Sequence, residues 1–286
     1  MTDHVTAHAG TRRFDPWKGA ILAALIILAV AFLAPTVGVL LSSLKSTRDI
    51  ALGNLWSVPT TLYLDNYVEV LTNPAVHTYL VNTLLVAVPA TIGSIALGIL
   101  AGYVFAKLPF RGSNLLFLVL VAGMFFPPQV ILIPLFRLFN AMGLIDTLWP
   151  VIIVHIGLGI PICTLLMRNF FATVPNALRD AAILEGATEW QVLTRVALPI
   201  SLPALAVLVT LQFTWIWNDF LWPLIFTQSD DKRTIMLGLV SLKGQYSVAW
   251  GVQGALSLIA TLPTLIVFLF FQRYFIKGMT MGAVKG

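Results

Sequence analysis

Four residues near position 215 have the types and spacing that suit the binding of a polyol. They are Gln212, Trp215, Asp219 and Trp222, and Asn218 lies beside them. On one continuous helix, spacings of three, four and three residues would place these four within about 80° of one another. Aromatic faces with amide and carboxylate neighbours offer a polyol both apolar platforms and hydrogen-bonding groups. Anchoring at a membrane interface and contact with another subunit are the alternatives, because tryptophan is enriched at interfaces.

A further polar candidate, Gln129, lies in a proline-rich stretch with Pro127, Pro128 and Pro134. Each proline would free a backbone carbonyl, which then needs another partner or a water-lined cavity. Broken helices that carry an uncharged polar residue occur along transport pathways, although a kinked packing helix has the same pattern. Gln129 is therefore added to the candidate path residues.

The elements that must position these residues span a membrane. The chain is 58% hydrophobic and 10% charged, with a mean hydropathy of +0.91, which excludes an ordinary soluble globular protein. Runs of roughly 20 apolar residues, the length that crosses about 30 Å of hydrocarbon, predict the transmembrane spans. We place these spans at residues 19–41, 79–106, 114–136, 147–167, 200–226 and 252–272. The predicted fold class is an all-α polytopic membrane protein with six transmembrane helices.

The distribution of Lys and Arg predicts the orientation of these spans. With the N-terminus in the cytoplasm, eleven of the 17 Lys and Arg residues lie inside and six lie outside, in agreement with the positive-inside rule. Both termini are then cytoplasmic. The net charge of +5 is accordingly a topology signal, and no basic patch on a soluble domain supports nucleic-acid binding. The expected segments are a cytoplasmic tail (1–18), the first span (19–41), an external segment (42–78), a core domain (79–272) and a second cytoplasmic tail (273–286).

Several kinds of chemistry are excluded by what the sequence lacks. Cys163 is the one cysteine, which excludes intramolecular disulfides and cysteine-ligated metal sites, and we expect neither a metal site nor catalytic residues. There is no GxxxxGK[ST] phosphate-binding loop, so any energy from ATP must come from another subunit. In the second span, small residues recur every four positions, a pattern typical of close helix packing. These residues are Ala90, Ser94, Gly98 and Gly102.

The cytoplasmic connection at residues 175–198 has the pattern of two short helices joined by a turn, and we call it the elbow. Leu178, Ala181, Ala182 and Glu185 fall at helical spacing in its first half. Gly186 follows them and can take the left-handed conformation that commonly ends a helix. The first helix is therefore expected to end at this glycine.

The second half of the elbow begins with a capping pattern. Thr188 and Gln191 form a capping box for a helix that should run to about Val196. A helix that lies on lipid should carry several Lys or Arg residues. In the elbow, however, the acidic residues outnumber the basic ones, and the charged positions are Asp180, Glu185, Glu189, Arg179 and Arg195. The elbow therefore suits a groove on another protein better than a lipid surface.

The elbow resembles the EAA loop of ATP-binding-cassette importer permeases, whose pattern is EAA, three residues, Gly, nine residues, Ile-x-Leu-Pro. The matching positions are Asp180, Ala181, Ala182, Gly186, Val196, Leu198 and Pro199. Aspartate replaces the first glutamate, valine replaces the isoleucine, and Glu185 keeps the charge before the glycine. The chain is also similar to maltose-type carbohydrate permeases in FTWIWNDFLWPLIFT of the fifth span, in the run from Trp250 and Gly251 to Gln253, and in the terminal GMTMGAVKG.

This resemblance implies a permease subunit of an importer in a bacterial or archaeal cytoplasmic membrane. An extracytoplasmic binding protein would deliver a mono-, di- or oligosaccharide to this chain and to a second, homologous permease that forms a heterodimer with it. Two copies of a cytoplasmic ATP-binding subunit would use ATP and Mg, so this chain itself would bind no cofactor. Residues 180–196 would be the coupling helix, which passes motion to the fifth span through Pro199. In related importers the main sugar contacts can belong to the second permease.

The resemblance also implies a role for the C-terminal tail, which can reach toward the ATP-binding subunits in this family, the alternative being a frayed terminus. The residues concerned are Gly282, Ala283, Val284, Lys285 and Gly286.

Two other functional classes are alternatives to an importer permease. An ion-coupled secondary transporter would need embedded acidic residues, for which Asp219 is the one candidate. A scaffold subunit would have no need of an acidic docking helix that leads directly into a span.

Overall fold

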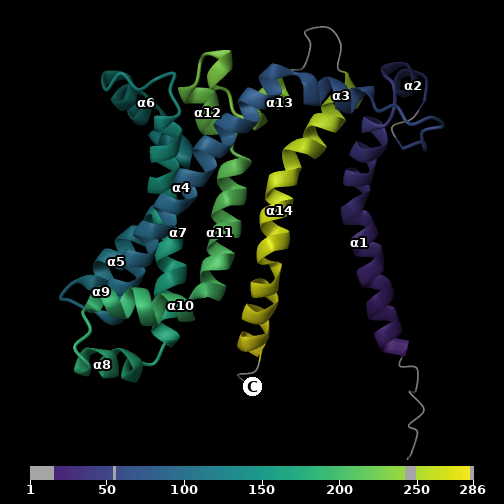
Figure 1. The fold of residues 1–286 in the computed structure, drawn as a ribbon. Helices are drawn as coiled ribbons and strands as arrows, with labels where there is room; N and C mark the ends of the chain where they lie inside the picture. Colours follow the sequence, from purple (N-terminus) through teal and green to yellow (C-terminus); the bar gives the residue numbers. More distant parts are fainter. Residues whose placement is uncertain (1–15, 54–55, 242–248, 284–286) are drawn as a thin grey trace, which may run out of the picture.

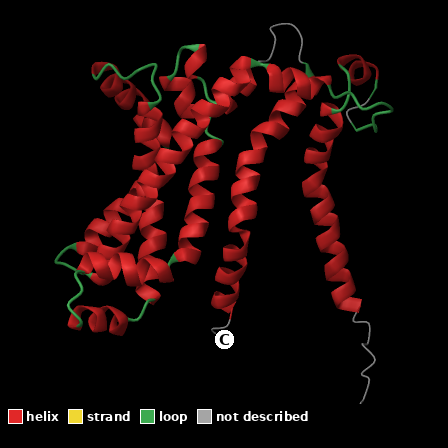
Figure 2. Ribbon diagram, in the orientation of Figure 1, coloured by secondary structure: helices red, strands yellow, loops and turns green. Residues whose placement is uncertain are grey.

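The computed structural model describes residues 16–53, 56–241 and 249–283, and every regular element among them is helical (Figure 2). The all-α prediction is therefore confirmed. The elements are α1 (Pro16–Ser43), α2 (Thr47–Leu52), α3 (Asp65–Thr72), α4 (Pro74–Lys107), α5 (Ser113–Ala122), η1 (Gly123–Phe125), η2 (Pro128–Ile131), α6 (Leu132–Ala141), α7 (Trp149–Thr173), α8 (Asn176–Leu184), α9 (Glu189–Val192), η3 (Leu193–Ala197), α10 (Leu198–Ile200), α11 (Leu202–Trp217), α12 (Leu221–Phe226), η4 (Asp230–Lys232), α13 (Ile235–Ser241) and α14 (Trp250–Ala283).

Within these described ranges, four helices are long and apolar enough to cross a membrane alone, namely α1, α4, α7 and α14. Two further spans exist if each bent pair of helices is counted as one. One pair is Ser113–Phe125 with Pro128–Ala141, bent by 93°, and the other is Glu189–Ile200 with Leu202–Trp217, bent by 79°. Four of the six predicted spans are thus continuous helices, and the third matches the first bent pair. The predicted fifth span at residues 200–226 covers α11 and α12, whereas the second bent pair begins earlier, at Glu189, and ends at Trp217.

The predicted span at 114–136 is not one straight helix, because Pro127 and Pro128 interrupt it as the sequence indicated. Phe126 has extended backbone and η2 begins at Pro128, which occupies a first-turn position where its missing N–H is no loss. The helix of the second span begins five residues before the predicted start of that span at residue 79. Asn73 accepts a hydrogen bond from the Ala75 amide at 2.9 Å and caps a helix that begins at Pro74.

The elements outside the long helices lie at two opposite ends of the molecule (Figure 1). The start of α1, the elbow helix α8 and the C-terminal end of α14 lie at one end, whereas α2, α3, α6, α12 and α13 lie at the other. This arrangement is the one expected if both termini and the elbow share one side of a membrane.

The structural core is the seam between α4 and α7, where small residues allow close approach. A Cβ atom placed on Gly98 would lie 2.3 Å from Cβ of Cys163, and one on Gly102 would lie 2.8 Å from Cβ of Met167. On the opposite helix, a Cβ atom on Gly159 would lie 2.7 Å from Cβ of Ser94. The small-residue stripe of the second span is therefore a packing surface, as its spacing predicted.

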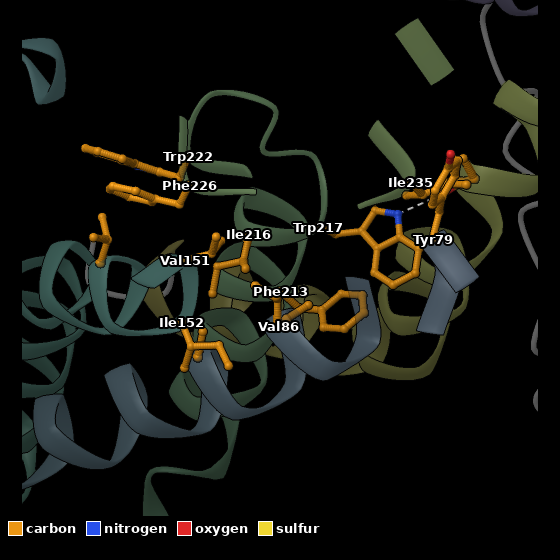
Figure 3. Packing of buried hydrophobic residues seen from close by; sticks show 14 of the residues in the cluster. Tyr79, Val86, Val151, Ile152, Phe213, Ile216, Trp217, Trp222, Phe226 and Ile235 are labelled. Atoms are coloured by element: carbon orange, nitrogen blue, oxygen red, sulfur yellow. Dashed lines mark hydrogen bonds between the residues drawn. The ribbon is translucent and has the colours of Figure 1, made fainter. Parts of the chain in front are cut away.

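Two buried apolar clusters flank this seam. The first lies toward the end that carries α12 and α13, and it includes Trp217, whose indole N–H donates to the Ala260 carbonyl of α14 at 2.8 Å (Figure 3). The second lies beside the elbow and includes Tyr103, Met167 and Leu193. The elbow is thus packed against the transmembrane core.

Loops at the α12 end are held by one carboxylate. Asp146, whose φ of 63° lies in the left-handed region, accepts from the amides of Gln228 and Ser229, both at 2.8 Å, and from the Ser229 hydroxyl. Its own amide donates to the Phe226 carbonyl at 2.8 Å. The bonds from Ser229 and Gln228 stabilise the charged form and lower the pKa of Asp146. The carboxylate therefore holds the segment after α12 against the loop before α7.

Candidate functional site

The first helix of the elbow ends at Gly186, as predicted. Gly186 has a φ of 87°, its amide donates to the Ile183 carbonyl at 3.0 Å, and the Ala187 amide donates to the Ala182 carbonyl at 3.0 Å. These two bonds form a Schellman motif, in which a left-handed residue satisfies the last carbonyls of a helix. The turn thus depends on a backbone conformation that glycine adopts at little cost.

The second half of the elbow begins with the predicted capping box and then departs from the prediction. The Thr188 amide donates to Oε1 of Gln191 at 2.8 Å, and the Gln191 amide donates to Oγ1 of Thr188 at 3.3 Å. However, α9 ends at Val192, and residues Leu193–Ala197 form a π-helical turn rather than an α-helix to Val196. A π-helical turn accommodates one extra residue. The predicted start was therefore right, and the helical segment does pass Val196, but its second turn is of the π type.

The elbow has an exposed arm and an embedded arm. On α8, the Leu184 side chain is 89% exposed and Leu178 is 45% exposed, with Ala181 exposed beside them. Asp180 and Glu185 flank this apolar strip and are exposed as well. Helix α8 lies at the same end of the molecule as the start of α1 and the C-terminal end of α14 (Figure 1).

Of the remaining predicted elbow residues, Ala182 and Val196 are partly buried and pack against the second cluster. Leu198 is also partly buried, and Pro199 is exposed in the short helix before the 79° bend. Farther into the embedded arm, Val192, Leu193 and Ala197 are buried against α4 and α7. The exposed arm is therefore free to contact another protein while the second arm is fixed in the core.

Charged residues join the two arms to each other and to α4. Glu189 of α9 pairs with Arg179 of α8 and accepts a hydrogen bond from Tyr103 of α4 at 2.8 Å. The hydrogen bond to Glu189 raises the pKa of Arg179. Lys107, the last residue of α4, donates to the side chain of Asn176 at 2.7 Å. Tyr103 and Lys107 were missed in the sequence, where the only signal was two polar side chains at the end of an apolar span.

The predicted polar stripe of the fifth span is not on one helix face. α11 ends at Trp217 and α12 begins at Leu221, because Asp219 caps the new helix by accepting from the amides of Leu221 at 3.1 Å and Trp222 at 3.2 Å. An aspartate that satisfies the free amides of a helix start competes with continuation of the preceding helix. The prediction that the four residues share one face was therefore wrong.

The structure brings Gln212 and Trp215 together at one cavity, which none of the other candidate residues lines. Both line a cavity of about 560 Å³ between the bend of the third span, α7 and α11. The Gln212 amide is buried, and its Oε1 has no hydrogen-bond partner in the described part of the chain, whereas Trp215 is 45% exposed. The other lining residues are Gly123, Met124, Phe126, Pro128, Gly157, Leu158, Pro161, Ile162 and Leu211.

The other predicted path residues lie elsewhere. Trp222 is 2% exposed and stacks on Phe226 with ring centroids 5.7 Å apart (Figure 3). Asn218 is exposed and donates to the Thr214 carbonyl at 2.8 Å. Gln129 is exposed and is not among the residues that line the cavity. The tryptophan at position 222 therefore belongs to the core, where its packing accounts for its type without a ligand.

One residue beside the cavity was missed by sequence reasoning. His155 of α7 is fully buried, and its Nε2 lies 3.1 Å from Oδ2 of Asp219. Its ring meets the Trp215 ring edge-on, with centroids 5.5 Å apart. His155 thus connects the cap of α12 to the tryptophan of the cavity. The signal in the sequence was a lone histidine within an apolar span.

The predicted tail falls mostly outside the described structure. α14 runs to Ala283 and so includes Gly282 and Ala283 in its last turn. Val284, Lys285 and Gly286 lie outside the described residues. Contact of the tail with an ATP-binding subunit therefore stays a prediction.

Known proteins share both the sequence pattern and this arrangement of helices. Residues 94–281 match the model of a family described as binding-protein-dependent transport system inner membrane component. The chain is 37% identical over 260 residues to a probable ABC transporter permease of Pyrococcus horikoshii, covering 90% of this chain and 94% of that protein. It is 32% identical over 274 residues to the arabinooligosaccharides transport system permease AraQ of Halalkalibacterium halodurans, covering 93% of this chain and 98% of that one.

The fold is also similar to that of a solved transporter. The neighbour is a chain of a bacterial ABC transporter involved in the import of the acidic polysaccharide alginate. The TM-score is 0.79, the sequence identity is 24%, and the match covers 93% of this chain and 99% of that chain. At this identity, the likeness concerns the arrangement of helices alone.

Proposed function

The chain belongs to the family of binding-protein-dependent transport system inner membrane components, and we propose that it is the membrane-spanning subunit of an importer that carries a sugar. A multi-pass membrane location agrees with four apolar helices and two bent pairs in the described ranges. The name of the arabinooligosaccharide relative supports a sugar as the substrate. Mono-, di- and oligosaccharides all remain within this proposal.

The observation that carries the proposal is the exposed arm of the elbow. Leu184 is 89% exposed at the tip of α8, in a strip flanked by Asp180 and Glu185. An exposed leucine gains about 2 kcal/mol when it is buried, and the two carboxylates disfavour burial in an anionic lipid surface. A cleft with apolar and basic groups on an ATP-binding subunit satisfies both requirements.

Docking of α8 in a cleft of an ATP-binding subunit would also define the partners of this chain and its orientation in the membrane. Two copies of a cytoplasmic ATP-binding subunit would hydrolyse ATP with Mg, because this chain has no phosphate-binding loop of its own. The end that carries α8 would then face the cytoplasm together with both termini. A second, homologous permease and an extracytoplasmic sugar-binding protein would complete the importer in a bacterial or archaeal cytoplasmic membrane.

Purification from native membranes tests this assembly. An affinity-tagged chain, extracted in mild detergent, should bring with it a second permease and an ATP-binding subunit that hydrolyses ATP. Mass spectrometry identifies the chains, and phosphate release measures the activity. Sugar uptake by proteoliposomes that contain this chain alone, driven by an ion gradient and without ATP, would instead establish a secondary transporter and overturn the proposal.

Within the same proposal, the cavity beside Trp215 and Gln212 contacts the sugar on its way through the membrane. The partly exposed indole offers an apolar platform, and the Gln212 amide next to it offers hydrogen-bonding groups. Trp222, Asn218 and Gln129 are not part of this contact.

Replacing Trp215 by alanine should weaken the response of the importer to its sugar. We expect the sugar concentration that half-maximally stimulates ATP hydrolysis to rise by roughly two- to tenfold, the equivalent of about 0.5–1.5 kcal/mol of aromatic contact. Trp149→Ala is the matched control, because Trp149 is also exposed (60%) but does not line the cavity. Equal stimulation of the Trp215→Ala variant and the wild type would show that the cavity is not on the sugar path.

A further inference from the structure

Two polar links join the exposed helix α8 to the end of α4. The first is made by Lys107, whose Nζ donates to the Val174 carbonyl at 2.5 Å and to Oδ1 of Asn176 at 2.7 Å. Val174 lies just before α8, and Asn176 is its first residue. This link therefore holds the start of α8 to the last residue of α4.

The second link is a network of three residues with Glu189 at its centre. Oε2 of Glu189 accepts from the Tyr103 hydroxyl of α4 at 2.8 Å and from Nε of Arg179 at 3.3 Å, while Oε1 accepts from Nη2 of Arg179. Tyr103 is 3% exposed, and its ring meets that of Phe171 of α7 edge-on, with centroids 5.6 Å apart. Charge-assisted bonds of this kind are the stronger ones in proteins. One carboxylate thus connects α4, α8 and α9.

Both links reach α4, and α4 is packed closely against α7. Gly98 and Gly102 of α4 leave no space against α7, so that even one added Cβ atom would lie within 3 Å of Cys163 or Met167. Close packing along this seam therefore couples a displacement of α4 to α7. The two helices form one body, which we call the α4–α7 pair.

The connection from α9 to α11 is less direct. It passes through the π-helical turn at Leu193–Ala197 and then through the 79° bend between Ile200 and Leu202. Irregular turns and bends interrupt the regular hydrogen-bond ladder and are sites where a helix can change direction. A displacement of α8 thus meets a stiff connection to α4 and a more yielding one to α11.

We propose that Glu189 is a positioning residue that transmits the displacement of α8 to the α4–α7 pair during the transport cycle. This inference rests on the proposed docking of an ATP-binding subunit on α8. In this inference α4 receives the motion of α8, whereas the sequence analysis expected that motion to pass through Pro199 to the fifth span. Arg179 makes the contact on α8, the helix that moves, and Tyr103 makes the contact on α4, the helix to which the motion is passed.

The test measures movement of α4 in the complete importer, and its probe is ATP with orthovanadate, so no sugar has to be known. Spin labels are attached through cysteines placed at Leu97 of α4 and Leu265 of α14, both 45% exposed. The native Cys163 is buried and stays in place. Pulsed electron spin resonance then gives the distance between the labels with and without ATP and vanadate.

In the importer with native Glu189, we expect the distance distribution to shift when ATP and vanadate are added. Glu189→Gln keeps one acceptor oxygen but loses the charged pair with Arg179, so it should strongly reduce that shift while the ATP-binding subunits remain attached and still trap nucleotide. Tyr103→Phe keeps the ring against Phe171 and should also reduce the shift, and the two changes together should reduce it by less than the sum of their separate effects, because they act on one network. Arg111→Gln is the control and should leave the shift unchanged, since Arg111 is exposed, lies outside the elbow and makes no hydrogen bond or ion pair within the described ranges.

Two outcomes would overturn the inference while leaving the proposed function intact. One is an unchanged distance in the importer with native Glu189 despite trapped nucleotide, which would show that α4 does not move. The other is a full shift in Glu189→Gln, which would show that the network does not transmit it. Failure of the ATP-binding subunits to co-purify with the native chain would instead overturn the proposed function itself.

Discussion

Replacing Gly186 by valine will detach the ATP-binding subunit and abolish uptake while the chain stays in the membrane. A Cβ atom at this position would meet no other atom within 4 Å, so the cause is conformational and not steric contact. The φ of 87° costs an ordinary residue about 1–2 kcal/mol and is a still rarer conformation for a β-branched residue. Relief of that strain breaks the Schellman bonds and moves α8. The recovery of the ATP-binding subunit with the tagged chain should fall by roughly tenfold.

Gly186→Asn is the matched control for this prediction. Asparagine enters the left-handed region several times more readily than other non-glycine residues, and the open surroundings accept its side chain. This variant should keep most of the bound ATP-binding subunit and most of the uptake. Equal loss in both variants would point to a contact made by the glycine surface itself, and no loss in either would show that the turn does not govern docking.

The second large effect is expected in the seam between α4 and α7. Gly98→Val would place Cβ 2.3 Å from Cβ of Cys163 and 2.9 Å from its backbone carbonyl carbon. Because backbone atoms cannot rotate away, the two helices would have to move apart at this contact. Overpacking of this kind costs about 1–3 kcal/mol or more, and close approach is what holds such helices together in lipid. We expect the variant to lose thermal stability and to accumulate poorly.

The one cysteine of the chain reports directly on this separation. Cys163 is fully buried against Gly98, so its thiol should resist a maleimide reagent in the folded native chain. In Gly98→Val it should react at temperatures where the native chain does not. Gly123→Val is the control, because nothing lies within 4 Å of a Cβ atom there. Protection of Cys163 to the same temperature in all three proteins would contradict the role of the seam.

Features set by local interactions were predictable from the sequence. The turn at Gly186 and the capping box of Thr188 and Gln191 depend on residues within a few positions of one another, and both were confirmed. The stripe with Gly98 and Gly102 was also recognised, since small residues every four positions form one continuous groove along a helix. The helix that packs into this groove was not predictable, because that depends on the arrangement of helices in space.

Two features of the site were missed for different physical reasons. The break before α12 was missed because the apolar pattern continues past Asp219, although an aspartate ahead of an apolar run is also a helix cap. The network around Glu189 was missed because Tyr103 lies 86 residues earlier in the chain. A carboxylate in the first turn of a helix is favourable on local grounds alone, and nothing nearby in the sequence indicates a distant hydroxyl.

The central claim is that α8 docks on an ATP-binding subunit, and light-induced cross-linking from Leu184 tests it most directly. A photoreactive benzophenone amino acid replaces Leu184, which is 89% exposed at the tip of α8, and the cells are irradiated before extraction. The control position is Phe32 on α1, which is 81% exposed and lies within an apolar span. Leu184 should give an adduct that mass spectrometry identifies as an ATP-binding subunit, and Phe32 should give none. Adducts from Leu184 that contain lipid alone, in an importer that still hydrolyses ATP and carries its substrate, would contradict the claim.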